Sequence, residues 1–107
     1  MLTADTHLPL LRQALEHQRA SRMDQAEALY QQVLRAAPEH ALALHLLGVL
    51  LGQTGRQQEG VTALRRSVAL NPRDPLAHHN LAVVQLELQD VEAAARAVRV
   101  ALALHPA

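Results

Sequence analysis

Seven histidines are the residues of this chain whose chemistry could include metal binding or proton transfer. His78 and His79 are adjacent, so on a helix they would point to different faces and could not hold one ion together. His45 and His79 are separated by the interval at which the prolines of this chain recur, and in a fold that repeats at this interval their rings could approach each other. The third place in the same series is Leu11, which cannot bind a metal. We therefore predict no metal site and no cofactor, and we expect the two histidines to line a surface.

Nucleophilic catalysis also finds no support in the sequence. Ser21 and Ser67 are not surrounded by the glycine pattern of a nucleophile elbow or of a phosphate-binding loop. The chain has no cysteine, which excludes disulfides and thiolate metal sites. The acidic residues are scattered along predicted solvent faces. The sequence therefore predicts that this chain is not an enzyme.

Composition limits the possible partners. Half of the residues are hydrophobic and Tyr30 is the only aromatic residue, which favours packed helices of Leu, Ala and Val. Ten arginines and no lysine stand against ten acidic residues, so no basic excess attracts nucleic acid or an anionic membrane. No apolar stretch approaches the roughly 20 residues that span a bilayer. The N-terminal residues do not resemble a signal peptide, so we expect a cytoplasmic protein. Abundant Ala, Arg and Leu indicate a GC-rich, bacterial genome.

Three prolines reveal an internal period. Pro38, Pro72 and Pro106 are equally spaced, and apolar or small residues in the segments before them fall in register. A fixed period of about 34 residues is typical of stacked helix–turn–helix units. We therefore predict a single domain over residues 1–107, with repeats at about 7–40, 41–74 and 75–107.

The helices of the middle unit can be placed from its apolar residues. Leu44, Leu47 and Leu51 share one face of a helix predicted from about residue 39 to residue 53, and Gly55 ends it. The second helix of the unit then runs to Pro72. Because the predicted loops are only a few residues long, consecutive helices must be antiparallel.

Capping residues mark three helix starts. Thr6 precedes the first predicted helix, and Ser21 with Asp24 resembles a capping box before the second. Asp74 and Pro75 supply an N-cap and a first-turn proline for the fifth helix.

The residues at equivalent places resemble those of the tetratricopeptide repeat family over essentially the whole chain. The middle repeat supplies Leu44, Leu47, Gly48, Leu51, Gly60, Leu64, Ser67 and Pro72; the third supplies His78, Leu81, Ala82, Gln85, Ala94, Val98, Ala101 and Pro106; and the first supplies Leu10, Gln13, Ala14, His17, Ala26, Tyr30, Val33 and Pro38. The resemblance implies an all-α fold, an α-solenoid of three helix–turn–helix repeats with six antiparallel helices.

Small residues should lie where the two helices of one repeat cross. We expect Gly48 and Gly60 to form such a close approach in the middle repeat. Gly52, by contrast, is expected on a binding surface, where alanine should be accepted with a small gain in stability.

The resemblance also implies that the first helices of the repeats line a concave groove. The side chains expected to bind a partner there are Leu8, Leu11, Leu15, Leu42, His45, Val49, Leu76, His79, Asn80, Val83 and Leu86. A mostly apolar groove suits an amphipathic helix or a leucine-rich segment. The alternative is that these leucines pack against a neighbouring helix of the same assembly.

Family members that bind chaperone C-termini hold the carboxylate with basic and asparagine side chains. Asn80 occupies one asparagine place, but Arg12 and Leu46 stand at its counterparts and the chain has no lysine. The predicted function is a protein–protein interaction module, a scaffold or adaptor that binds a partner peptide or helix. The alternatives are the non-catalytic N-terminal segment of a larger glycosyltransferase, sulfotransferase or methyltransferase, and a secretion-type chaperone.

The last predicted helix has an apolar stripe that nothing in the predicted fold covers. Its residues are Val91, Ala94, Ala95, Val98 and Leu102. A terminal repeat usually has a polar outer face, and a net charge of zero removes repulsion between copies. We therefore expect a homo-oligomer formed through this helix.

Overall fold

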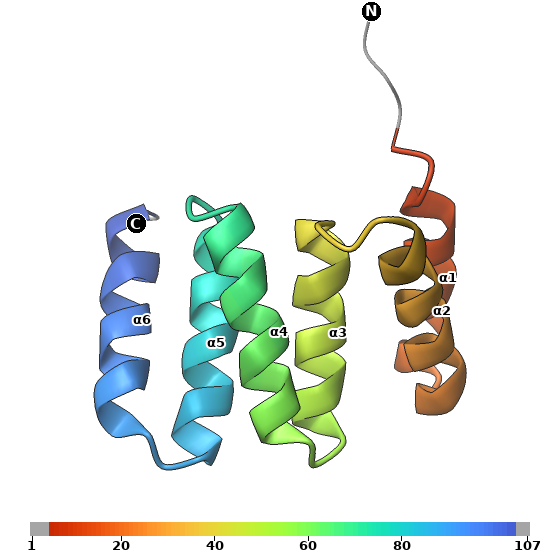
Figure 1. The fold of residues 1–107 in the computed structure, drawn as a ribbon. Coiled ribbons are helices and arrows are strands. Elements are labelled where there is room, and N and C mark those ends of the chain that lie inside the picture. Colours follow the sequence, from red (N-terminus) through yellow and green to blue (C-terminus); the bar gives the residue numbers. More distant parts are fainter. Residues whose placement is uncertain (1–4, 105–107) are drawn as a thin grey trace, which may run out of the picture.

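The computed structural model describes residues 5–104, which form six helices and no strands (Figure 1). The helices are α1 (Leu8–Arg19), α2 (Met23–Ala36), α3 (Ala41–Gln53), α4 (Gln57–Leu70), α5 (Pro75–Glu87) and α6 (Val91–Leu104). The predicted all-α architecture is confirmed.

The helices pair in chain order and the pairs then stack. In each pair, α1 with α2, α3 with α4 and α5 with α6, the second helix packs against the first. The pairs are joined by contacts of α2 with α3 and of α4 with α5, and α3 also contacts α5. Figure 1 shows the resulting row of helices, with α1 and α2 at one end and α6 at the other. This is the arrangement of a solenoid, in which each unit contacts only its neighbours.

The turn inside each pair uses the same backbone conformation at equivalent residues. Ser21, Gly55 and Gln89 have φ angles of 62°, 84° and 63°, and they are equally spaced along the sequence. Only glycine adopts this left-handed region without steric cost, so Gly55 suits its turn best. The predicted end of the third helix before Gly55 is confirmed.

The helix starts agree only partly with the capping predictions. Asp74 is the N-cap of α5, where its Oδ1 accepts hydrogen bonds from the backbone N–H groups of Leu76 and Ala77. The predicted capping box is wrong, because the N-cap of α2 is Arg22 and Ser21 lies in the preceding turn. No side chain caps α1, whose N-cap is His7 rather than Thr6.

The start of α3 also differs from the prediction. This helix begins at Ala41, two residues after the predicted start at residue 39. The Nδ1 atom of His40 accepts a hydrogen bond from the backbone N–H of Ala43 at 3.1 Å. Histidine thus takes the capping role that Asp74 has at α5, which explains the later start.

Gly48 and Gly60 allow α3 and α4 to approach closely. A Cβ atom on Gly48 would lie 2.6 Å from Leu64 Cγ, and one on Gly60 would lie 2.9 Å from the Gly48 carbonyl oxygen. The predicted crossing point is therefore confirmed. The prediction for Gly52 is wrong, because this residue is buried and a Cβ atom there would lie 2.9 Å from Val84 Cγ2 of α5.

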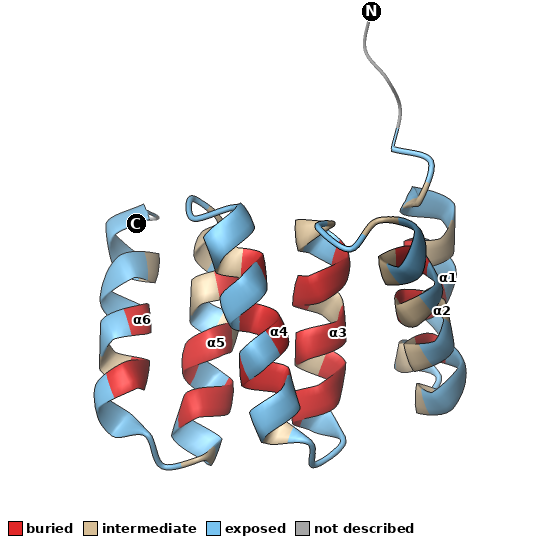
Figure 2. Cartoon of the chain, in the orientation of Figure 1, coloured by how far each residue is buried: buried red, intermediate tan, exposed pale blue. Residues whose placement is uncertain are grey.

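Figure 2 shows buried residues along the row of helices. Their side chains form two clusters. One joins α1, α2 and α3, and the other joins α4, α5 and α6. Tyr30 is the largest fully buried side chain, and its hydroxyl donates a hydrogen bond to Gln18 Oε1 at 2.8 Å. Burial raises the pKa of Tyr30 to about 12, because the apolar surroundings penalise the phenolate.

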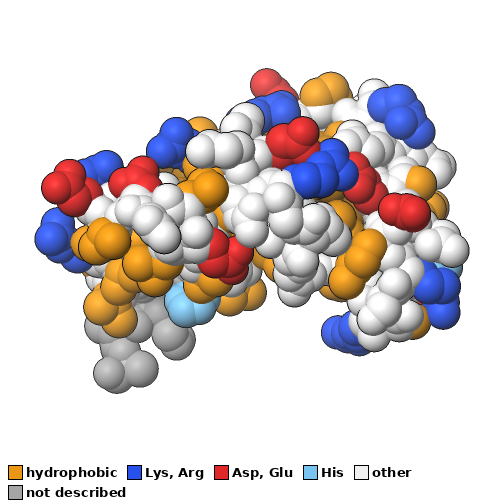
Figure 3. Space-filling model, turned by 90° about the horizontal axis from the view of Figure 1, so that it is seen from below, with side chains coloured by type: hydrophobic (Ala, Val, Ile, Leu, Met, Phe, Trp, Pro, Cys, Tyr) orange, Lys and Arg blue, Asp and Glu red, His pale blue; other side chains and the backbone are white. Residues whose placement is uncertain are grey.

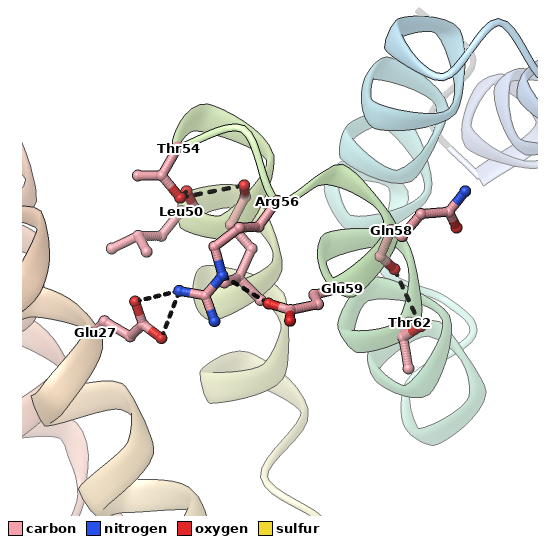
Figure 4. Close-up of polar contacts among 8 residues, drawn as sticks. Glu27, Leu50, Thr54, Arg56, Gln58, Glu59 and Thr62 are labelled. Carbon is pink, nitrogen blue, oxygen red and sulfur yellow. Dashed lines mark hydrogen bonds and ion pairs between the residues drawn. The ribbon is translucent and has the colours of Figure 1, made fainter.

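Arg56 connects the first repeat to the second on the outside of the row. Figure 4 shows its guanidinium between α2 and α4, donating to both carboxylate oxygens of Glu27 and to Glu59. These hydrogen bonds raise the pKa of Arg56. Beside them, Thr54 Oγ1 donates to the Leu50 carbonyl oxygen and so helps to end α3. The ion pair of Arg56 with Glu27 bridges the two repeats. Because it is exposed to solvent, its net contribution to stability is small.

Candidate functional site

The described residues do not gather into a metal-binding arrangement. Within residues 5–104, no group of three or more His, Asp or Glu side chains could hold a metal ion. In the same range, no helix has the length and apolar character needed to cross a bilayer. The surface does carry exposed apolar side chains, and these are the residues that could form a binding site.

Six of the predicted binding residues lie on the accessible side of the first helices. Leu8, Leu42 and Leu76 occupy equivalent places near the starts of α1, α3 and α5, and all three are exposed. Further along the same helices, Leu15 and Val49 are half-buried and Val83 is exposed. We call these six residues the first-helix surface. Figure 3 shows that one long side of the molecule is hollowed.

Two of the predicted binding residues are buried, so they cannot contact a partner on the first-helix surface. Leu11 is 2% exposed and His45 is 3% exposed. Each lies at the junction with the next repeat, so the stacking of that repeat removes it from solvent. The equivalent residue of the third repeat, His79, is exposed. The expectation that the rings of His45 and His79 line one trough is therefore wrong for His45.

The buried His45 belongs to a polar contact between the second and third repeats. Its Nε2 atom lies 2.8 Å from Asn80 Nδ2, and its Nδ1 atom lies 3.6 Å from Asp74 Oδ2. With the Asn80 amide donating to Nε2, the imidazole proton lies on Nδ1 and faces the carboxylate. Burial lowers the pKa of His45, and the nearby Asp74 opposes that shift. Asn80 is thus engaged inside the protein rather than free to bind a carboxylate.

The remaining predicted residues lie near the far end of the row. His79 and Leu76 line a hollow of about 400 Å³ together with Pro75, Ala101 and Leu102. Leu86, near the C-terminal end of α5, is 52% exposed. This hollow lies between α5 and α6 and is bordered mostly by apolar side chains. Figure 3 shows hydrophobic side chains gathered at the α6 end of the molecule.

The apolar stripe predicted for the last helix is largely correct. Val91, Val98 and Leu102 are exposed and Ala95 is half-buried. Ala94 departs from the prediction, since it is buried in the contact with α5. Self-association through this helix remains a prediction.

A second hollow, which the sequence did not predict, lies over α3 between α2 and α4. It has a volume of about 450 Å³, and Leu44, Leu47 and Leu51 are among its lining residues. Its charged rim is already engaged, because Arg56 pairs with Glu27 and Glu59 and Arg66 donates to the Pro38 carbonyl oxygen. The hollow therefore lies at the junction of the first two repeats, with the arginines at its rim held by contacts within the chain.

Comparison with solved structures places this geometry among known solenoids. A mutant O-GlcNAc transferase of Thermobaculum terrenum matches with a TM-score of 0.90 and 39% identity. The match covers 99% of this chain but only 21% of the transferase chain. The chain therefore spans about a fifth of that protein.

More distant structures share the fold. The first tetratricopeptide domain of Spaghetti (RPAP3), bound to an HSP90 peptide, matches with a TM-score of 0.90 and 18% identity, covering 98% of this chain and 83% of that domain. MamA matches with a TM-score of 0.81 and 22% identity, covering 98% of this chain and 57% of its own. No curated protein matches the chain. The family model of the tetratricopeptide repeat matches residues 11–75 and 50–107. With this match and the helical pairs in register, the chain belongs to the tetratricopeptide repeat family.

Proposed function

We propose that this chain is a non-catalytic interaction module that binds an apolar or amphipathic protein segment on its first-helix surface. The observation that supports the proposal is the recurrence of exposed leucine at equivalent places. Leu8 is 40%, Leu42 is 41% and Leu76 is 57% exposed. Isolated exposed leucines need no explanation, whereas a row of them at a fixed spacing along one surface is typical of a binding site.

The chemistry of this surface favours an apolar partner over an acidic peptide. Asn80 is hydrogen-bonded to His45, and its counterparts in the other repeats are Arg12 and Leu46. The chain has no lysine, so the first-helix surface lacks the cluster of cations that binds a carboxylate. An amphipathic helix laid across leucine and valine side chains is the mode of recognition that these residues support best.

A matched pair of substitutions tests the proposal. Peptides that bind the chain are first selected from a displayed library of amphipathic sequences, and their affinities are measured by titration calorimetry. Leu42→Glu should weaken binding at least about tenfold, because a carboxylate would be placed in an apolar contact. Leu70→Glu is the control, since Leu70 is also 42% exposed but lies at the end of α4. Equal effects of the two substitutions, with helicity intact in both, would contradict the proposal.

The second candidate is that the chain is the non-catalytic N-terminal part of a larger transferase. The match to the Thermobaculum terrenum O-GlcNAc transferase, at 39% identity over 99% of this chain, favours it. The test is the gene sequence beyond codon 107. An in-frame transferase domain would support this candidate, and a stop codon there would contradict it.

A further inference from the structure

A third hollow lies over α5, at the junction of the second and third repeats. It has a volume of about 240 Å³, and its lining includes Arg65 of α4, Gln85 of α5 and Arg96 of α6. We call it the α5 hollow. It is the counterpart of the hollow over α3, because most lining residues of the two occupy equivalent places in the repeats. The hollow over α3 stays open although another repeat follows it, so such a hollow does not arise from a missing neighbour.

The two hollows differ in the chemistry of their linings. Three places that are uncharged around the hollow over α3 carry polar or cationic side chains around the α5 hollow. Gln85 replaces Leu51, and the two arginines replace Gln31 and Thr62. None of the described residues that line the α5 hollow is acidic. The α5 hollow therefore has a cationic rim and a polar group in its floor.

The two arginines of this rim are free to bind an anion. Within residues 5–104, neither Arg65 nor Arg96 forms an ion pair. Both side chains are exposed. Around the hollow over α3, by contrast, Arg56 is paired with two carboxylates and Arg66 donates to a backbone carbonyl oxygen. Two guanidinium groups at one hollow are a suitable site for a carboxylate, which accepts paired hydrogen bonds from arginine.

Gln85 adds a buried group that has no partner. The residue is 4% exposed, and its Oε1 atom accepts no hydrogen bond within the described part of the chain. The neighbouring lining residues Leu81 and Ala97 have no side-chain donor. A buried polar atom without a partner is unfavourable for the fold, and leucine fills the equivalent place in the second repeat without this cost. Because Gln85 lines the hollow, a molecule bound there is placed to supply the missing donor.

We infer that the α5 hollow is a second binding site, which takes an acidic segment of a protein partner. A carboxylate of this segment pairs with Arg65 and Arg96, and a neighbouring backbone N–H donates to Gln85. A phosphate ion would satisfy the arginines but offers mainly acceptors, so it would leave the glutamine oxygen unpaired. The site shares no residue with the first-helix surface, so failure of one site leaves the other untouched.

The test uses a short acidic peptide as the probe. The tetrapeptide acetyl-Gly-Glu-Glu-Gly-amide is titrated at neutral pH into the isotope-labelled full chain and followed by NMR. It should shift the side-chain amide signals of Gln85 and the Nε–H signals of Arg65 and Arg96, with saturation. The control peptide with glutamine in place of both glutamates should not. Inorganic phosphate at the same concentration should leave the Gln85 signals in place. Equal shifts of the Gln85 signals with either control would overturn the inference.

Variants of the arginines show whether the effect belongs to the hollow. Arg65→Gln and Arg96→Gln should each weaken binding of the acidic peptide at least about fivefold, because each removes a charge-assisted contact. Arg99→Gln is the matched control, since Arg99 is an exposed arginine of α6 that does not line the hollow. It should change the affinity less than about twofold. Equal losses in all three variants would indicate general charge attraction and would overturn the proposed site.

Gln85→Leu separates a binding role of the glutamine from a structural one. Leu51 occupies the equivalent place in the second repeat and is buried there, so leucine is expected to fit. The variant should raise Tm by at least about 2 °C, because it removes an unpaired buried amide. It should also weaken binding of the acidic peptide at least about fivefold, because the acceptor for the peptide N–H is lost. A lower Tm, or an unchanged affinity, would overturn the role of Gln85 in the site.

Discussion

At the scale of single residues, Gly60 shows how tightly α3 and α4 are packed. A Cβ atom at this position would meet the Gly48 carbonyl oxygen at 2.9 Å and the Gly52 backbone nitrogen at 3.1 Å. Both are backbone atoms, which cannot rotate away as the end of a side chain can. The sequence predicted the small residues at this crossing, but it could not predict that Gly52 faces Val84 of the next repeat.

Gly60→Ala should therefore destabilise the protein by about 1–3 kcal/mol, the usual cost of overpacking. In an ordinary helix the same change would stabilise by up to about 1 kcal/mol. Denaturant unfolding of the parent and the variant measures the difference. Thr62→Ala, at an exposed position of the same helix, is the control and should not destabilise. A more stable Gly60→Ala variant would contradict the close approach of the two helices.

His45 makes the stability of the fold depend on pH. Burial lowers its pKa below the ordinary value of 6.5, so the folded state favours the neutral ring while the unfolded chain takes up a proton more readily. The contribution of this residue to stability is thus complete above pH 6.5. It is lost as the pH falls below that value toward the lower pKa of the folded state.

We expect the free energy of unfolding of the parent to fall between pH 7.5 and pH 5.5, and to fall less in His45→Gln, which has no titrating ring. Urea unfolding at the two pH values measures both. His79→Gln is the matched control, because the equivalent ring of the third repeat is exposed, and this variant should keep the pH response of the parent. An unchanged pH response in His45→Gln would show that the buried ring of His45 does not cause it.

At the scale of the helices, the sequence predicted number, order and pairing well but predicted the starts less well. The internal period and the apolar stripes are strong features, because each helix must bury one face. The starts depend on single side chains. His40 caps α3 through Nδ1, and histidine is not among the residues usually recognised as N-caps. The sequence does not distinguish Ser21 from an N-cap, because the left-handed turn at this residue leaves no sign in a residue other than glycine.

The cap of α5 gives a direct test at this scale. Asp74→Ala should cost about 1 kcal/mol, because the N–H groups of Leu76 and Ala77 lose their acceptor. Ser21→Ala should change the free energy of unfolding by less than about 0.5 kcal/mol, since Ser21 does not cap α2. Thermal melts of both variants measure the two losses of stability. Equal losses would indicate that Ser21 caps α2 after all.

At the scale of the whole molecule, burial depends on whether a neighbouring repeat covers a residue. Leu11, His45 and His79 occupy equivalent positions in the three repeats, and the sequence predicted that all three line the binding groove. The structure separates them, because α3 and α5 cover the first two. A period read from the sequence identifies equivalent residues, but the order of stacking decides which of them remain free to bind. This is why the accessible leucines could be predicted and the buried members of the same set could not.

Helices that neighbouring repeats cover on several sides should need more free energy to open locally than helices with an uncovered side. α6 has one apolar side uncovered, whereas α3 contacts α4, α5 and α2. Amides of α6 should therefore exchange with solvent through local opening, while those of α3 should exchange near the global unfolding free energy. Native-state hydrogen exchange followed by NMR measures both. Equal protection of the two helices would contradict a stack whose stability is distributed repeat by repeat.

Amide shift mapping by NMR tests most directly whether a partner binds on the first-helix surface. A peptide selected for binding is titrated into the isotope-labelled chain, and the perturbed amides are placed on the structure. The largest changes should cluster around Leu8, Leu42 and Leu76 and along the accessible side of α1, α3 and α5. Changes concentrated instead on α2 and α4, with these three leucines unaffected, would contradict binding on this surface.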